Sequence, residues 1–210
     1  MVRKPIERSL DYFYHVTARS NNKDYFYLPI ETLWGIYSNR LAELQKSQSI
    51  DIAAFVLMHN HFHLMLRTPS ADIDKVMYFL MKQTTIDIQK QSGRINKIYG
   101  GRYKGSIIKN EDYLYNVIKY IYLNPVKAGI VQKAETYPFS TLFYKFNNEL
   151  QLQFQITKSL EVLNELSWIN SGFSEKENKS IKTGLRKSVF EFGKEKSSGK
   201  AIVPNGELFL

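Results

Sequence analysis

The chain has 210 residues, of which 43% are hydrophobic and 14% aromatic, and its formal net charge at pH 7 is +9. This composition excludes a disordered protein, the absence of cysteine excludes disulfides and thiolate metal sites, and no run reaches the roughly 18 apolar residues of a membrane span. We therefore expect a cytoplasmic protein with no membrane contact. Its positive charge favours nucleic acid as a partner, and the alternative is that the charge only keeps the protein in solution.

Strands and helices alternate along the first half of the chain. Aromatic and β-branched residues predict the strands, which are residues 12–18, 50–57, 62–67 and a short segment that ends at Ile108. Apolar residues at helical spacing predict the helices, which are residues 30–48 and a long helix from Ser70, its expected N-cap, to Gly93. The order strand–helix–strand–strand–helix–strand is ferredoxin-like. We therefore expect an α+β fold in which an antiparallel sheet carries its helices on one face.

The helical and strand patterns weaken in the last third of the chain. We divide the chain into a main domain, residues 1–146, and a small, mainly helical, lysine-rich extension, residues 147–210. Residues 156–168 and 175–200 carry apolar residues at helical spacing, and residues 199–210 are expected to form a loose tail. The basic extension is interpreted as a solvated helix face, with a second nucleic-acid contact as the alternative.

Two histidines begin the third predicted strand, one residue apart. Because side chains alternate between the faces of a strand, His61 and His63 point the same way and Phe62 points the other way. Two imidazoles on one face are the beginning of a divalent-metal site, but two ligands do not hold a metal. The alternative is a structural role for both histidines, so a metal site requires further ligands from elsewhere in the chain.

A helix expected from Asn110 to about Pro125 supplies further polar groups. Tyr120 and Asn124 are four residues apart, which places their side chains one turn apart on the same face. Tyr113 shares that stripe but lies about 16 Å from Asn124 along the helix axis. The alternatives are that Tyr120 packs in the core and that Asn124 and the following proline only end the helix.

Together these residues suit phosphoryl transfer with a tyrosine nucleophile. Two imidazoles and one amide oxygen can hold Mg²⁺ or Mn²⁺ while leaving positions open for a phosphate. The metal would polarise a phosphodiester, and the Tyr120 oxygen would attack phosphorus to give a 5′-phosphotyrosine and a free 3′-hydroxyl. The covalent link keeps the ester energy, so the strand can be rejoined to another end, whereas a water nucleophile would suit a plain nuclease.

A set of motifs occurs in order along roughly residues 12–143. The motifs are Tyr14–Arg19, Met58–Leu66, Gly101–Lys104 and Tyr120–Gly129. With them the chain resembles the single-tyrosine HUH transposases of the insertion-sequence type, in particular the branch associated with repetitive extragenic palindromes (REP). The resemblance implies a ferredoxin-like palm and a divalent metal. The residues that it assigns are the metal ligands His61, His63 and Asn124 and the nucleophile Tyr120.

The resemblance also implies a single-stranded DNA substrate, often a hairpin, a location with the nucleoid of a bacterium, and either a monomer or a homodimer. Arg102 and Lys104 flank Tyr103 in a glycine-rich loop, which suits contacts to backbone phosphates and base stacking. The alternative is a basic hairpin with the aromatic ring packed inward. Arg19 and Lys127 are further candidates for phosphate contacts.

Two other histidines lie near these motifs. His59 stands where the family pattern leads us to expect proline, an acidic residue or another small polar residue, and it is a competing ligand if its strand starts early enough. His15 is assigned to the core or to support of the ligands. Three hypotheses follow: a metal-dependent tyrosine strand transferase, a domesticated DNA-binding protein with little or no turnover, and a metal-dependent nuclease that uses water.

Overall fold

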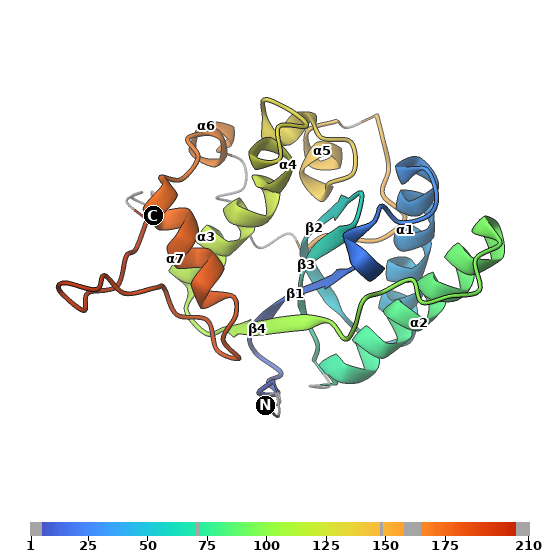
Figure 1. Cartoon of the computed structure of the whole chain (residues 1–210), viewed down its shortest axis with the longest axis horizontal. Helices are drawn as coiled ribbons and strands as arrows, with labels where there is room; N and C mark the ends of the chain where they lie inside the picture. The colour runs from blue at the N-terminus through green and yellow to red at the C-terminus, as the bar shows by residue number, and fades with distance from the viewer. Residues whose placement is uncertain (1–5, 70–71, 148, 158–164, 205–210) are drawn as a thin grey trace.

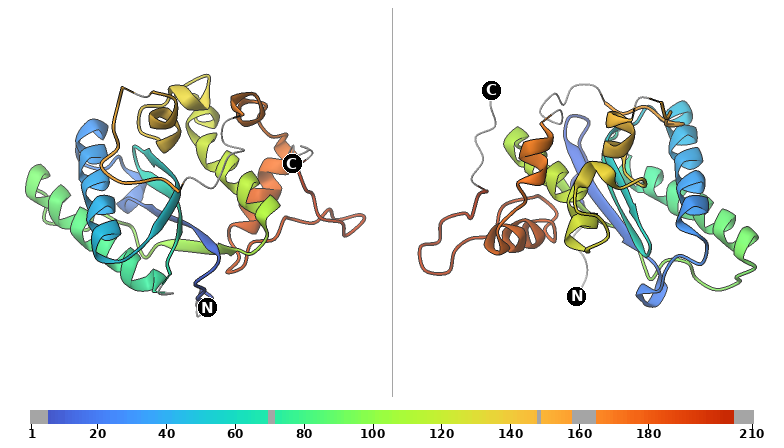
Figure 2. Two further views of the ribbon diagram at one scale, coloured as in Figure 1. Left: turned by 180° about the vertical axis from the view of Figure 1, so that it is seen from behind. Right: turned by 90° about the horizontal axis from the view of Figure 1, so that it is seen from above.

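A four-stranded antiparallel sheet forms the centre of the molecule, with helices on both of its faces (Figures 1 and 2). The computed structural model describes residues 6–69, 72–147, 149–157 and 165–204. The strands, in sheet order, are β2 (Asp51–Met58), β3 (His61–Arg67), β1 (Phe13–Arg19) and β4 (Lys104–Ile108). This order with antiparallel pairing throughout is ferredoxin-like, so the expected fold class is confirmed.

The two helices that connect the strands, α1 (Ile30–Ser47) and α2 (Ile73–Ser92), lie together on one face of the sheet, as expected (Figure 2). Alternation along β2 and β3 turns Phe55 and Phe62 toward α1. Trp34 of α1 stacks on Phe55 with ring centroids 5.4 Å apart. This aromatic packing buries one face of the sheet and leaves the other face to carry the polar residues of β3.

The ends of α2 follow the sequence signals that predicted it. The helix stops at Gly93, whose φ of +69° is in the left-handed region that favours glycine. Asp72 occupies its N-cap position, and the predicted cap Ser70 lies outside the described residues.

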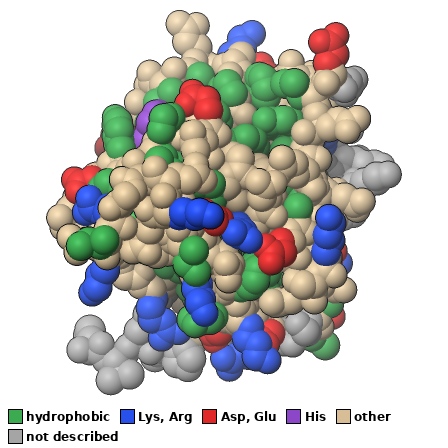
Figure 3. All heavy atoms as spheres, turned by 90° about the vertical axis from the view of Figure 1, so that its right-hand side faces the viewer, with side chains coloured by type: hydrophobic (Ala, Val, Ile, Leu, Met, Phe, Trp, Pro, Cys, Tyr) green, Lys and Arg blue, Asp and Glu red, His purple; other side chains and the backbone are tan. Residues whose placement is uncertain are grey.

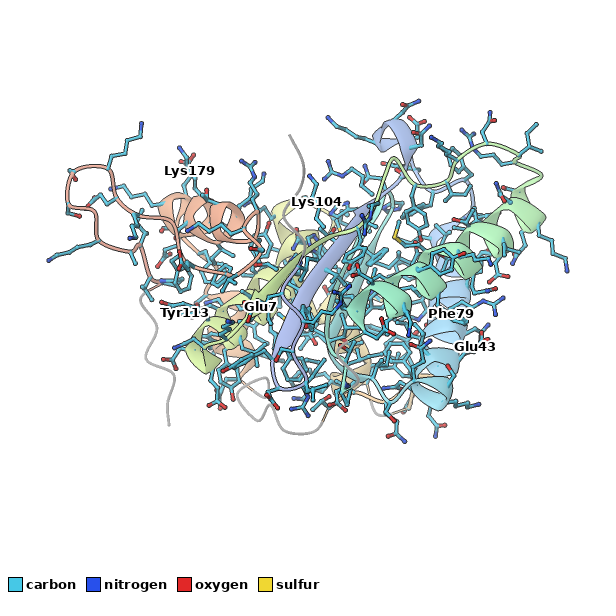
Figure 4. The ribbon with its side chains drawn as sticks, turned by 90° about the horizontal axis from the view of Figure 1, so that it is seen from below. Glu7, Glu43, Phe79, Lys104, Tyr113 and Lys179 are labelled. Carbon is cyan, nitrogen blue, oxygen red and sulfur yellow. The ribbon has the colours of Figure 1, made fainter. Side chains whose placement is uncertain are left out.

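Helix α3 (Glu111–Tyr122) covers the opposite face of the sheet, and the short helix α4 (Asn124–Lys127) follows it directly. The expectation that the helices lie on one face therefore holds for α1 and α2 but not for α3. The Asn110 side chain caps α3 by accepting a hydrogen bond of 3.0 Å from the backbone N–H of Tyr113. Figure 4 shows α3, with Tyr113 near its start, between the sheet and the C-terminal helix. The predicted helix is therefore confirmed, and its placement brings it over the histidine face of β3.

The remaining elements are short. They are the 3₁₀ turns η1 (Asn21–Lys23) and η2 (Ala134–Thr136) and the helices α5 (Thr141–Phe146), α6 (Leu166–Asn170) and α7 (Glu175–Gly184).

The two helices predicted in the extension differ from the described structure. Ile156 and Thr157 are not helical, residues 158–164 of the first lie outside the described residues, and α6 begins only at Leu166. The second helix stops at Gly184 instead of running toward residue 200.

The chain leaves α7 early because its next segment bonds to the sheet. Ile107 of β4 donates a backbone hydrogen bond to Ser188 and accepts one from Phe190, which forms a parallel bridge at the sheet edge. Part of the expected loose tail is also tied down, since Ile202 donates to the carbonyl of Gly193. Residues 205–210 lie outside the described residues. No helix within the described ranges combines the length and apolar character needed to cross a membrane.

Candidate active site

His61 and His63 lie side by side on the face of β3 that α3 covers, with ring centroids 5.1 Å apart. The Nδ1 atom of His61 lies 2.7 Å from the side-chain oxygen of Asn60, to which it donates. The Nδ1 atom of His63 lies 2.8 Å from Nε2 of His15 on the neighbouring strand β1. Because both Nδ1 atoms have partners within the protein, the two Nε2 atoms are left as the ligating atoms.

All three imidazoles are held neutral. Burial lowers the pKa of His61 to about 4, and the nearby Arg19 adds to the effect. Burial also lowers the pKa of His63 well below its usual value and the pKa of His15 to about 3. A neutral imidazole is the form that ligates a metal, so the pair is in that form at neutral pH.

Tyr120 lies across from the histidines. Its ring is perpendicular to that of His63, with centroids 6.1 Å apart, and only 9% of the residue is exposed. Burial raises the pKa of the Tyr120 hydroxyl, and the positive charge of Arg186 opposes that rise. The hydroxyl is therefore protonated at neutral pH, in a position beside the histidine pair.

Asn124 lies one turn after Tyr120, as the four-residue spacing predicted. Its side-chain N–H group donates to the backbone oxygens of Tyr120, at 2.8 Å, and of Ile121, at 3.3 Å. No hydrogen bond from a described residue reaches its side-chain oxygen. That oxygen is the atom that the metal prediction requires, and Asn124 lines the same cleft as His61 and His63.

The donor set fits a hard divalent cation shared with a phosphate. The described residues hold no group of three or more His, Cys, Asp or Glu side chains placed to bind a metal. Two Nε2 atoms and one amide oxygen give a partial coordination sphere without a carboxylate, which leaves positions for phosphate oxygens. Mg²⁺ or Mn²⁺ bound by His61, His63 and Asn124 stays a prediction.

His59 does not compete for this site. It lies in the turn before β3 rather than in the strand, and its ring packs on Tyr25 with centroids 4.8 Å apart. The strand therefore starts too late for His59 to share the parity of His61 and His63.

A cleft of about 1050 Å³ opens at this site, and basic side chains line it. The basic residues along its walls are Arg19, Lys23, Arg102, Lys104, Lys127, Lys182 and Arg186. No Asp or Glu is among the described residues that line it. By contrast, Lys, Arg, Asp and Glu are interspersed on the side of the molecule shown in Figure 3. The cleft is therefore a local concentration of positive charge that suits a polyanion.

Four of the five predicted DNA contacts line this cleft, namely Arg19, Arg102, Lys104 and Lys127. The fifth, Tyr103, does not line it: the residue is 6% exposed, and its hydroxyl donates to Asp74 at 2.7 Å. The alternative of an aromatic ring packed inward is therefore the one that the structure shows.

Sequence reasoning missed three of the basic residues. Lys23 belongs to a turn that carries no motif, and Lys182 and Arg186 belong to the extension, whose basic character was interpreted as a solvated helix face. Nothing in the sequence marks these residues as lining the cleft of the histidine pair, because their positions there depend on how the chain folds. His15, by contrast, supports a ligand, which was one of its two predicted roles.

Comparison with known proteins gives consistent matches. Residues 10–124 match the family model described as "Transposase IS200 like". A protein of Haemophilus influenzae named as a REP-associated tyrosine transposase is 24% identical over 62% of this chain and 78% of its own length. The REP-associated tyrosine transposase of Escherichia coli K12 is 28% identical over 53% of this chain and 66% of its own.

A solved structure has a similar fold. It is a REP-associated tyrosine transposase bound to a REP hairpin, and it matches with a TM-score of 0.58 at 20% identity. The match covers 75% of this chain and 92% of that one.

Proposed function

The chain belongs to the family of IS200-like transposases, and on that premise we propose that it cleaves and rejoins single-stranded DNA in the basic cleft between β3 and α3. One observation carries the proposal. Tyr120 lies beside the histidine pair, in a cleft lined by basic side chains and, among the described residues, by no carboxylate. A tyrosine in that position can reach a phosphodiester that the cations hold.

In the proposed reaction the Tyr120 oxygen attacks the phosphorus of one phosphodiester. The bond from phosphorus to the 3′ oxygen breaks, and the products are a 5′-phosphotyrosine and a 3′-hydroxyl on the leaving strand. The raised pKa keeps the Tyr120 hydroxyl protonated beforehand, so it loses its proton to solvent as the new bond forms, and the departing 3′ oxygen takes up a proton from solvent to become the hydroxyl. Attack by a 3′-hydroxyl on the phosphotyrosine reverses the step and rejoins the strand.

The residues around Tyr120 have separate roles. His61, His63 and Asn124 would hold Mg²⁺ or Mn²⁺, which supplies Lewis-acid polarisation of the phosphate when bound. His15 and Asn60 fix the orientation of the two imidazoles.

The proposed substrate is a hairpin with a single-stranded flank. A solved relative is bound to a REP hairpin, and two curated relatives are named as REP-associated transposases. The basic cleft supplies phosphate contacts that do not depend on sequence.

The test is a covalent adduct between protein and DNA. The full chain is incubated with labelled single-stranded hairpin DNA and Mn²⁺, denatured and resolved by size. We expect a labelled band at the mass of protein plus DNA, and we expect Tyr120→Phe to abolish it. Tyr113→Phe, on the same helix but away from the cleft lining, is the matched control and should keep the band.

Two other outcomes separate the rival functions. Cleavage without an adduct, unchanged by Tyr120→Phe, would show a nuclease that uses water. Binding without cleavage across several hairpins would show a DNA-binding protein without turnover. Either result would contradict the proposed strand transfer.

A further inference from the structure

The C-terminal helix α7 is fixed against the catalytic helix α3. Phe190, which follows α7, bonds through its backbone to Ile107 of β4. Its ring also packs against Tyr113 at the start of α3, with centroids 5.7 Å apart. Gly184 ends α7 at a point where a Cβ atom would meet the Glu191 carbonyl and the Phe190 ring, so only glycine fits this fold-back without a shift.

A buried lysine makes a second attachment, next to Tyr120. Lys119 is 4% exposed, and its ammonium group donates to the Ser171 hydroxyl at 2.8 Å. The same group lies 4.8 Å from the ring centre of Trp168 and 4.7 Å from that of Phe173. All three partners belong to the segment before α7, so the extension is joined to α3 at the residue preceding the nucleophile.

These attachments bring two cations of the extension to the active-site cleft. Lys182 and Arg186 are both exposed and both line the cleft that contains Tyr120 and the histidines. No described carboxylate pairs with either of them, whereas the adjacent Lys187 pairs with Glu191 at 2.9 Å. Two cations without a carboxylate partner, in a cleft that no described carboxylate lines, favour the binding of an anion there.

Neighbouring charges support this conclusion. Burial and, second, repulsion from Lys182 lower the pKa of Lys127, another basic residue of the cleft, while the negative charge of Glu175 opposes the shift. The positive charge of Arg186 acts on the Tyr120 hydroxyl. Like charges held this close are unfavourable in the free protein and become favourable once phosphates lie between them.

We propose that α7 and the turn after it form a wall of the catalytic cleft, and that Lys182 and Arg186 bind phosphates of the DNA strand that carries the scissile bond. This inference rests on the proposed strand transfer and extends it, because it makes the extension part of the DNA-binding site. The extension is then required for binding and chemistry and is more than a solvated appendage.

The test compares charge removals inside and outside the cleft in the full chain. Arg186→Gln and Lys182→Gln remove a cleft cation. Lys187→Gln and Lys179→Gln remove the same charge from exposed neighbours that do not line the cleft. Binding of a labelled single-stranded hairpin is measured across salt concentrations, and adduct formation is measured at saturating DNA with Mn²⁺.

We expect each cleft variant to weaken binding about tenfold, since each loses one charge-assisted phosphate contact. We also expect it to lower the slope of log affinity against log salt by about 0.7. Arg186→Gln should in addition slow adduct formation at saturating DNA, and Arg186→Lys should restore binding. The controls should change affinity by less than about twofold. Equal losses in cleft and control variants would overturn the proposal.

A failure of the proposed strand transfer can be told apart from a failure of the proposed contact between α7 and DNA. If the unaltered chain binds DNA but forms no adduct, strand transfer is wrong, while the binding series still decides whether α7 contacts DNA. Thermal melts of the variants separate loss of contact from loss of fold, because these exposed substitutions leave the core unchanged.

Discussion

At the scale of single residues, the site depends on which nitrogen of each imidazole is left to bind the metal. Asn60 and His15 occupy the Nδ1 atoms of His61 and His63, so both rings present Nε2 to the cleft. His15 is 2% exposed and lines the cleft, and its Nε2 atom lies 2.8 Å from Nδ1 of His63. Its expected effect is therefore on how well the ring of His63 is oriented.

We predict that His15→Ala lowers the apparent Mn²⁺ affinity in adduct formation by about 10- to 100-fold, the usual cost of removing a partner of a metal-binding histidine. Raising Mn²⁺ should recover most of the rate. His15→Gln can still accept a hydrogen bond from Nδ1 of His63, so its apparent Mn²⁺ affinity should lie between those of His15→Ala and the unaltered chain.

His59→Ala is the matched control for this series. His59 packs on Tyr25 outside the cleft, so its removal should leave the Mn²⁺ dependence unchanged. A shift in Mn²⁺ dependence as large as that of His15→Ala would contradict the assignment of the ligands.

At the scale of elements, the sequence predicted those whose pattern is local. The strands, α1, α2 and α3 follow apolar spacing and capping residues, and the Tyr120–Asn124 pair follows from helical geometry alone. The contact between His15 and His63 required the register of β1 against β3, which no local pattern encodes. The early end of α7 likewise depends on a hydrogen bond between Ile107 and Phe190, far apart in sequence.

The junction between α3 and the extension gives a pH-dependent prediction. Burial lowers the pKa of Lys119 to about 8 in the folded chain, from a usual value of 10.5. Between those values the unfolded chain binds more protons than the folded one, so the free energy of unfolding gains a favourable contribution as pH rises. Below pH 8 both states carry the proton and the contribution is constant.

Lys119→Met removes this titration. Denaturant unfolding at pH 7 to 10.5 should therefore show that the stability of the unaltered chain rises relative to Lys119→Met, with most of the change above pH 8. A difference that stays constant with pH would contradict the burial of a titrating lysine at this junction.

At the scale of the whole molecule, one chain holds a complete constellation. Tyr120, the histidine pair and Asn124 line a single cleft, and the extension folds back in the same chain to complete its basic wall. The rings of His63 and Tyr120 have centroids 6.1 Å apart within one chain. This favours action in cis, with the nucleophile and the metal ligands supplied by the same chain. In a site shared between two copies, the nucleophile would instead come from the partner.

Mixing two inactive variants tests this arrangement. His63→Ala lacks a ligand and Tyr120→Phe lacks the nucleophile, so neither chain alone should form an adduct. If the site works in cis, the mixture should also form none, and the adduct rate per chain of the unaltered protein should not depend on protein concentration. Recovery of the adduct in the mixture would show a site shared between two copies.

We expect Tyr120 to be the residue that becomes joined to DNA. The most direct measurement is mass spectrometry of the adduct after digestion by nuclease and trypsin. The expected tryptic peptide, Tyr120–Lys127, contains both Tyr120 and Tyr122. Tyr122 is buried, and its hydroxyl lies 2.9 Å from that of Thr141. We predict fragment ions that place a nucleotide on Tyr120, and a nucleotide on Tyr122 or on any other peptide would contradict the account.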